Sequence, residues 1–232
     1  MRPEATTSNT LALGVLLAGG QGERLGLGMP KAHAMLAGHT LFERALAALG
    51  GACARVWVAA PTDMSLPVVA GDRHPFSRVD DPSGAGGPLA GIAAAAAAAA
   101  FASAASAAGV RIVTLAVDLP LVTVSTLRGL LASYDALGAA PGSISALVPA
   151  PGGRMQPLAA VWSAPAFAAL AGAFSRGERS LTRASATLAV RTLDDATLHR
   201  MGIAGDVALD VDTAADLAAI ARTLHDAARV SA

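Results

Sequence analysis

The sequence has few aromatic residues, one cysteine and no net charge. Aromatic residues make up 3% of the 232 residues, while Lys+Arg and Asp+Glu number 17 each. A neutral chain gives no bulk reason to expect nucleic acid or an anionic membrane as a partner, so any anion site must be local. The lone cysteine, Cys53, excludes an internal disulfide and a cysteine-based zinc site.

Long hydrophobic runs are also scarce. Residues 1–10 are polar and lack the basic-then-apolar order of a signal peptide. The one long apolar run, residues 92–110, is nearly all alanine and contains Ser103 and Ser106. Alanine gains little by leaving water and is the best helix former, so the run predicts a packed helix rather than a membrane span. We therefore expect a cytoplasmic protein with no membrane partner.

The remaining pattern alternates short apolar segments with helical ones. Strands are predicted at residues 11–17, 55–60, 76–79, 111–117, 144–148, 158–162, 189–192 and 207–209. Helices are predicted at 39–49, stopping at Gly50-Gly51, from Pro88 through the alanine run, and at 123–137, 165–174, 181–185 and 213–230. This order predicts an α/β fold, a single Rossmann-like three-layer domain over residues 11–230 with a mostly parallel central sheet. Residues 1–10 would be a flexible arm.

Several polar segments directly follow predicted strands. They are the glycine loop from Ala18, the loop from Asp80, Asp118, and the pair Asp210 and Asp212. In an open parallel sheet, ligands bind at the carboxyl ends of the strands. The sequence therefore predicts that these segments meet along one edge.

The glycine loop is the segment Leu17–Gly26 (LAGGQGERLG), followed by Pro30-Lys31. Glycines let backbone N–H groups approach an anion, and a nearby arginine and lysine add positive charge, so the segment predicts a phosphate-binding loop. It contains no Walker Gly-Lys-Ser/Thr. A dinucleotide-dependent dehydrogenase fits poorly, because Ala59-Ala60-Pro61 ends the second strand where an acidic residue is expected.

The combined spacing resembles the nucleotidyltransferases that transfer a nucleotide from an NTP to a small acceptor, and most of all the molybdenum cofactor guanylyltransferases. The resemblance is carried by Leu17-Ala18-Gly19-Gly20 with Arg24, Gly26 and Lys31, then Gly87-Pro88-Leu89-Ala90-Gly91, Asp118-Leu119-Pro120, Arg154-Met155-Gln156-Pro157-Leu158, and Asp210-Val211-Asp212-Thr213 with Asp216-Leu217. It implies GMP transfer from GTP to molybdopterin with Mg²⁺, and molybdoenzymes or cofactor-synthesis proteins as possible protein partners.

The resemblance also implies residue roles. Arg24, Lys31 and Asp118 would be catalytic: Arg24 on the pyrophosphate end of GTP, Lys31 on the α-phosphate, and Asp118 on Mg²⁺, which prefers carboxylate and phosphate oxygens. The nucleotide would further contact the two glycine-rich blocks, at Leu17, Ala18, Gly19, Gly20, Gly87, Pro88 and Leu89. A turn or capping role is the alternative for Asp118.

Two acidic pairs leave choices open. One aspartate before the Gly-Pro-Leu-Ala-Gly block would contact the nucleotide, and Asp80 is slightly preferred over Asp81 because it continues the strand directly. Asp210 and Asp212 point to one side of an extended segment and would join Asp118 on the metal; helix capping is the alternative for Asp212. Many guanylyltransferases resembling this chain carry asparagines here, so the Asp-x-Asp form leaves cytidylyl transfer open.

Arg154 and Gln156 are the predicted acceptor-binding residues, with Arg154 on the molybdopterin phosphate and a surface hairpin position as its alternative. Transfer to a sugar phosphate fits less well, because the chain is short and leaves no room for a large acceptor domain. A nucleotide-binding regulatory module with a decayed active site is the non-enzymatic alternative. The presence of Arg24, Lys31 and Asp118 argues against it.

Overall fold

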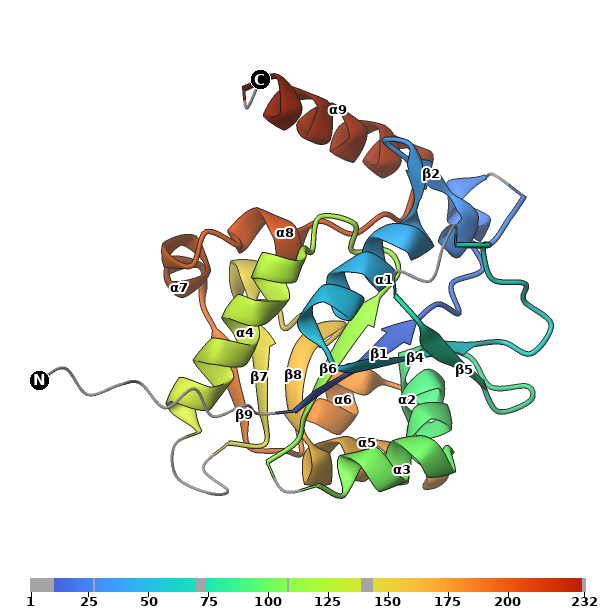
Figure 1. Cartoon of the computed structure of the whole chain (residues 1–232), viewed down its shortest axis with the longest axis vertical. Coiled ribbons are helices and arrows are strands. Elements are labelled where there is room, and N and C mark those ends of the chain that lie inside the picture. Colours follow the sequence, from blue (N-terminus) through green and yellow to red (C-terminus); the bar gives the residue numbers. More distant parts are fainter. Residues whose placement is uncertain (1–10, 27, 70–73, 108, 139–143, 231–232) are drawn as a thin grey trace, which may run out of the picture.

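The computed structural model describes residues 11–26, 28–69, 74–107, 109–138 and 144–230. The predicted N-terminal arm lies outside the described residues. A seven-stranded sheet forms the centre, in the order β5-β4-β1-β6-β8-β7-β9 (Figure 1). Its strands, in that order, are Phe76–Asp80, Arg55–Ala60, Ala12–Leu17, Arg111–Ala116, Ala159–Ser163, Ala146–Pro149 and Val190–Leu193.

The sheet is mostly parallel. Neighbouring strands pair in parallel except that β8 runs antiparallel to both β6 and β7. All six residues of β1 are buried, as expected for a central strand covered on both faces. The predicted three-layer α/β fold is confirmed.

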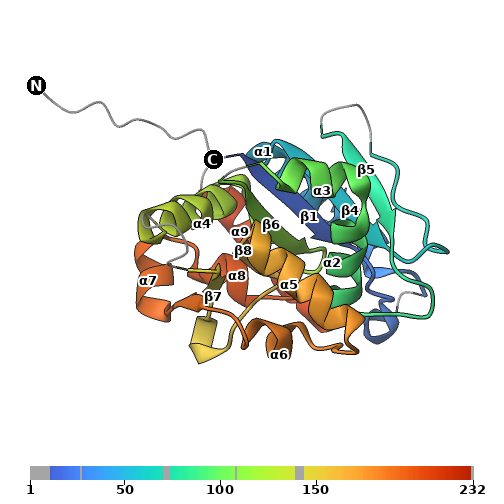
Figure 2. The ribbon, with the colours of Figure 1, turned by 90° about the horizontal axis from the view of Figure 1, so that it is seen from below.

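Helices cover both faces of the sheet (Figures 1 and 2). Helices α1 (Leu41–Ala52) and α4 (Val124–Leu137) pack on one face, while α2 (Pro88–Ala97), α3 (Ala99–Ala105), α5 (Ala164–Ser175) and α6 (Leu181–Ser185) pack on the other. The side chains of β1 alternate between these layers: Leu16 packs with the first group, Val15 and Leu17 with the second. This alternation is the period-two pattern of a strand.

Smaller elements complete the chain. They are η1 (Glu23–Leu25), η2 (Lys31–His33), the hairpin β2 (Met35–Leu36) and β3 (His39–Thr40), η3 (Pro151–Gly153), α7 (Asp195–Arg200), α8 (Ala204–Ala208) and α9 (Ala214–Val230). His39 was predicted to begin a helix, but it belongs to strand β3 of the hairpin. Helix α1 begins after Thr40, whose hydroxyl accepts a hydrogen bond from the Glu43 N–H in a capping box.

Two helix predictions were wrong. The first helix does not stop at Gly50-Gly51 but continues to Ala52. A Cβ on Gly51 would lie 2.5 Å from Val124 Cγ2, so the glycine serves close helix packing rather than termination. The alanine run is not one helix, because it breaks at Ala98 and the two halves are bent by 83°. The bend brings Phe101 into the core, with its ring centroid 5.0 Å from that of Trp57.

The predicted strand at 207–209 was also wrong. Val207 belongs to α8 and is fully buried. A short apolar run does not distinguish a strand from a buried helical turn. Among the described residues, no single helix is long and apolar enough to cross a membrane, and one bent pair, α2 with α3, reaches that length and composition together.

Candidate functional site

A cavity of about 160 Å³ lies at the carboxyl ends of the parallel strands. Its walls include the ends of β1, β4 and β6 and the loop after β5. Seven residues predicted to bind nucleotide or metal line it: Leu17, Gly19, Gly20, Asp81, Gly87, Pro88 and Asp118. The tertiary structure thus brings together three sequence blocks, around Leu17, Asp81 and Asp118, as their positions after the strands predict.

Glycines shape this cavity by their lack of a side chain. A Cβ on Gly19 would lie 3.1 Å from Asp81 Oδ2, and one on Gly91 would lie 2.8 Å from Leu17 Cδ2. Gly22 does not line the cavity, but it has a φ of +72°, and a Cβ there would lie 2.5 Å from the carbonyl oxygen of Met29. Gly91 is a site residue to which the sequence assigned no role, although the Gly-Pro-Leu-Ala-Gly block contains it.

The aspartate that faces the cavity is Asp81, not the slightly preferred Asp80. Asp80 is the last residue of β5, is exposed, and pairs with Arg78 at 2.8 Å between Oδ1 and Nε. Asp81 is buried, and its Oδ1 has no hydrogen-bond partner among the described residues. Burial and the neighbouring Asp80 raise the pKa of Asp81 to about 6, against the lowering effect of Arg78. An unpartnered buried carboxylate is costly unless a ligand satisfies it.

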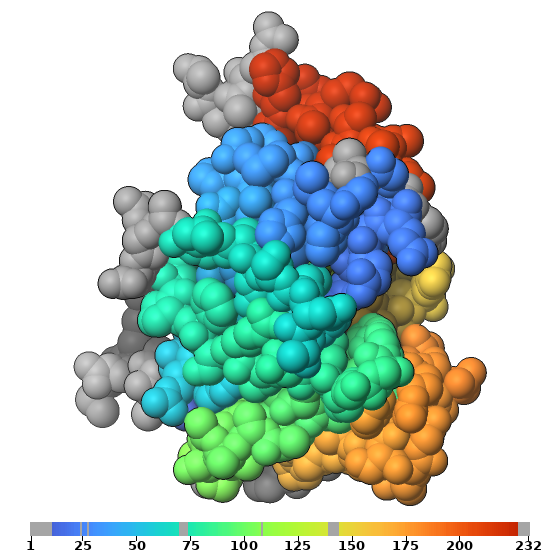
Figure 3. Space-filling view, turned by 90° about the vertical axis from the view of Figure 1, so that its right-hand side faces the viewer, coloured from blue at the N-terminus to red at the C-terminus, as the bar shows by residue number. Residues whose placement is uncertain are grey.

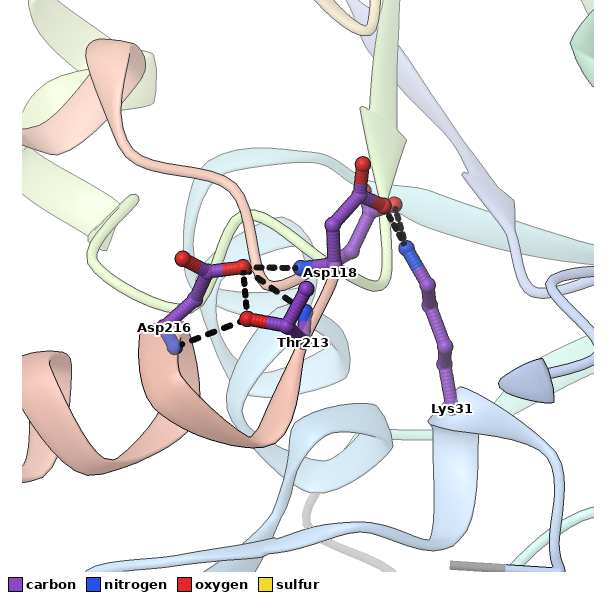
Figure 4. A network of polar contacts seen from close by, with 5 residues as sticks. Lys31, Asp118, Thr213 and Asp216 are labelled. Atoms are coloured by element: carbon purple, nitrogen blue, oxygen red, sulfur yellow. Dashed lines mark hydrogen bonds and ion pairs between the residues drawn. The ribbon is translucent and has the colours of Figure 1, made fainter. Parts of the chain in front are cut away.

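Lys31 joins two of the predicted metal-binding aspartates (Figure 4). Its Nζ lies 3.0 Å from Asp118 Oδ2 and 2.6 Å from Asp212 Oδ1. The lysine sits in η2, is 7% exposed, and its backbone N–H bonds to the Gly20 carbonyl. It is the only lysine in the sequence.

Burial and ion pairing shift the pKa values of Lys31 and Asp118 in opposite directions. Burial alone would lower the pKa of Lys31, but the two aspartates outweigh it and the pKa is raised. Burial raises the pKa of Asp118, and the attraction of Lys31 only partly offsets it. Asp118 Oδ1 is buried and has no hydrogen-bond partner among the residues that the structure describes, which leaves an oxygen for a further cation.

The loop that carries Asp210 and Asp212 is fixed against Asp118. The Val211 N–H donates to the Asp118 carbonyl at 2.8 Å. Asp216 Oδ2 accepts hydrogen bonds from the backbone N–H groups of Asp212, at 3.1 Å, and of Thr213, at 2.7 Å (Figure 4). The capping residue of α9 is therefore Thr213 with Asp216, and Asp212 Oδ1 pairs with Lys31.

The three predicted metal ligands do not form a closed cage. Asp118 and Asp212 meet at Lys31, whereas Asp210 lines a second cavity. Among the residues described, no group of three or more His, Cys, Asp or Glu is arranged to hold a metal ion. Mg²⁺ commonly takes one or two carboxylates and completes its shell with phosphate and water, and Asp118 and Asp212 fit that pattern.

The second cavity has a volume of about 590 Å³ and shares Pro88 and Leu158 with the first. Arg154 and Gln156, the predicted acceptor residues, both line it. Their segment is held by Thr114, a fully buried residue of β6 whose hydroxyl donates to the Pro157 carbonyl at 3.0 Å. Arg179, Ser180 and Thr182 also line this cavity and were missed. The signal for Arg179 and Ser180 was a polar segment before the helix predicted at 181–185, and Thr182 lies in that helix.

Three of the residues predicted to bind the nucleotide, Ala18, Arg24 and Leu89, are not among those that line the first cavity. Ala18 and Leu89 are fully buried, so only their backbones can face a ligand. Arg24 belongs to η1, and its side chain lies outside the part of the chain that the structure describes. Figure 3 shows the face on which the segments around residues 20–35, α2 and residues 175–185 come together.

The sequence that supplies these glycines, the buried lysine and Asp118 matches a known family. A model of the MobA-like NTP transferase domain matches residues 14–192. The chain belongs to the MobA-like NTP transferase family. It is a nucleotidyltransferase by that membership, as the spacing of the glycine-rich blocks predicts.

Solved structures share the fold of this MobA-like chain. Molybdopterin-guanine dinucleotide biosynthesis protein A from Archaeoglobus fulgidus is 21% identical, with a TM-score of 0.69 over 92% of this chain and 99% of that one. Rv0371C from Mycobacterium tuberculosis, in complex with manganese, is 20% identical with a TM-score of 0.58 over 92% and 98%. 2-C-methyl-D-erythritol 4-phosphate cytidylyltransferase from Thermus thermophilus is 23% identical with a TM-score of 0.57 over 91% and 100%. A search of curated proteins gave no match.

Proposed function

We propose that this protein transfers GMP from GTP to the terminal phosphate of molybdopterin. A phosphate oxygen of the acceptor forms a bond to the α-phosphorus, the bond to the β-phosphate bridging oxygen breaks, and pyrophosphate leaves with the electron pair. The acceptor is already anionic, so catalysis rests on alignment and charge neutralisation rather than on a strong base.

The observation that supports guanine is the buried carboxylate of Asp81 in the glycine-lined cavity. Guanine presents two adjacent donors, N1–H and N2–H₂, and a carboxylate accepts both with its two oxygens. Cytosine presents one exocyclic amino group on its pairing edge, which leaves one carboxylate oxygen unsatisfied. In this proposal the absence of side chains at Gly19 and Gly91 leaves room for the base.

The phosphates of GTP would extend from this cavity toward Lys31 and Arg24. The amino end of α2 begins at Gly87 and Pro88 in the cavity wall, and its partial positive charge favours an anion there. Asp118 and Asp212 would hold a divalent cation, Mg²⁺ in this proposal, which neutralises charge on the transferred phosphate. Lys31 places a positive charge at the same two carboxylates and would stabilise the charge that develops at the α-phosphate.

The acceptor would occupy the second cavity, beside Arg154 and Gln156, and approach GTP past the shared walls Pro88 and Leu158. Transfer would take place in the cytoplasm, with molybdoenzymes or cofactor-synthesis proteins receiving the product. Cytidylyl transfer to the same acceptor is the second candidate, motivated by aspartates at 210 and 212 where many resembling guanylyltransferases carry asparagine.

Nucleotide selectivity tests the proposal. We expect GTP with Mg²⁺ to raise the melting temperature of the purified protein more than CTP, ATP or UTP, because a ligand of the folded state stabilises it in proportion to its excess over Kd. Pyrophosphate should then be released from GTP when molybdopterin is added. Preference for CTP in both assays would establish the second candidate, and absence of turnover with every NTP would support a decayed site.

A further inference from the structure

Arg179 is an exposed arginine that is nevertheless held in one place. Its guanidinium carbon lies 4.3 Å from the centroid of the Phe174 ring. Its Nη1 donates at 2.9 Å to the carbonyl oxygens of both Phe174 and Glu178. Free surface arginines lose rotamer entropy when they are fixed, so three simultaneous contacts indicate a side chain built for one orientation.

The turn under Arg179 is fixed by Glu178. One of its carboxylate oxygens accepts hydrogen bonds from the backbone N–H groups of Arg179 and Ser180, both at 2.7 Å. Its other oxygen accepts from Arg183 Nε at 3.1 Å. Both carboxylate oxygens of Glu178 therefore accept hydrogen bonds from the backbone and from Arg183. Neither is paired with the guanidinium of Arg179 in the described structure.

The remaining donors of Arg179 have no partner. Its Nε and Nη2 make no hydrogen bond or ion pair with any residue that the structure describes. The side chain of Arg154 likewise has none among those residues. Both arginines line the 590 Å³ cavity, in which Asp210 is the acidic lining residue. Two guanidinium groups against one carboxylate give this cavity a net positive lining.

We propose that Arg179 is an acceptor-binding residue whose free Nε and Nη2 bind the acceptor's phosphate monoester together with Arg154. The inference rests on the proposed function, in which two anions must approach each other before the phosphoryl bond forms. Arginine suits this role because its planar fork binds two phosphate oxygens at once. Phe174 and the two carbonyls orient the fork before the ligand arrives, which lowers the entropic cost of binding.

Inorganic phosphate is the probe that tests Arg179. The nucleotide cavity is first filled with Mg²⁺ and the α,β-methylene analogue of GTP, whose own titration reports on the nucleotide site. Phosphate is then titrated calorimetrically into the wild-type protein, R179Q and R176Q. Arg176 is the matched control, because it is exposed, precedes Arg179 by three residues, and is not among the residues lining either cavity.

We expect R179Q to bind phosphate at least about tenfold more weakly than the wild type, since a charge-assisted hydrogen-bond pair is lost. R176Q should bind within about twofold of the wild type, and analogue binding should be equal in all three proteins. R179K, which keeps the charge without the fork, should fall between the wild type and R179Q.

Three results would overturn the inference: no phosphate binding by the wild type, equal phosphate binding by R179Q, or an equal loss in R176Q. If the GTP analogue itself fails to bind, the proposed function fails. The same phosphate titrations on the nucleotide-free proteins still decide the role of Arg179, so the two failures are distinguishable.

Discussion

The two cavities differ in what builds their walls. The first is bounded by glycines, by the ends of buried strands, and by Asp81 and Asp118, which are largely buried, and Lys31 pairs with Asp118. The second is larger and presents Arg154 and Arg179, which are exposed and stand on turns outside the parallel half of the sheet. Substitutions in the first cavity act on buried packing, whereas substitutions of the exposed arginines in the second leave the core in place. The first cavity should therefore tolerate substitution poorly, and the second should respond mainly in acceptor binding.

The largest effect on turnover is expected from Asp118→Asn. The amide keeps the size of the side chain but removes the charge that would hold the cation and pair with Lys31. We expect pyrophosphate release to fall at least about a hundredfold. Asp80→Asn is the matched control, because Asp80 is exposed, pairs with Arg78 and is not among the residues that line the cavity. Equal turnover of the Asp118 variant and the wild type would refute the metal assignment.

The largest effect on stability is expected from Lys31→Met. Removing the ammonium leaves Asp118 buried without its partner, at a cost of about 2–3 kcal/mol, somewhat below the value for a fully buried pair. Chemical denaturation of both proteins measures the difference. A change below about 0.5 kcal/mol would show that the pair contributes no more than a surface salt bridge.

Because Lys31 is the only lysine, ¹³C-lysine labelling gives one Cε signal that reports on this site. We expect Mg²⁺ with GTP to shift it, since the ammonium must then share its carboxylates with a cation and a phosphate. An unchanged signal at saturating GTP would place the nucleotide elsewhere.

Gly91→Ala tests whether the first cavity is rigid. Its new Cβ would lie 2.8 Å from Leu17 Cδ2 and 3.0 Å from Ala59 Cβ, so we expect a loss of about 1–3 kcal/mol in the free energy of unfolding. Gly205→Ala in α8 is the control, because no atom lies within 4 Å of its added Cβ. That change should stabilise the protein by about 0.5–1 kcal/mol. Destabilisation by both would point to a general helix effect.

The smallest effect concerns the pH dependence of GTP binding. The pKa of Asp81 is raised to about 6, so the folded protein holds this proton more tightly than the unfolded chain. Its contribution to stability is present at low pH and is lost as the pH rises through about 6. The affinity for GTP has the opposite pH dependence and increases as the pH rises, because guanine would bind the ionised carboxylate of Asp81.

Between pH 7 and pH 5 the Kd for GTP should therefore rise about tenfold. D81N should bind GTP more weakly and lose most of this dependence. Asp80 and Arg78 are the charged neighbours that also act on Asp81, so D80N serves as the control. An equal pH dependence in wild type and D81N would assign the titration to another group.

The parallel half of the molecule was predicted most closely. Strand β4 agrees with its prediction at both ends, and β1 and β6 differ by one residue, because a buried strand between turn residues is a local signal. The break between helices α2 and α3 could not be predicted from the local sequence. Ala98 interrupts an unbroken alanine run because Phe101 is buried against Trp57, a contact that no local pattern contains.

The same division holds for the site. Lys31 and Asp118 could be predicted as site residues from the spacing of their blocks, and their roles stay a prediction; the structure brings the two side chains to 3.0 Å. The choice of Asp81 over Asp80 depended on which side chain turns inward at the end of β5, and Arg78 pairing with Asp80 is visible only in three dimensions. Arg179 was missed because its contact with Phe174 and its place in a cavity wall arise only in the tertiary structure.

By itself the sequence determined the family, the α/β order and the glycine, lysine and aspartate blocks, since these depend on short-range spacing and strand ends. Only the tertiary structure decided which carboxylates meet Lys31, which aspartate faces the first cavity and which arginines share the second. Those choices are made by packing between segments far apart in the chain, where burial and the partners of each charge are fixed.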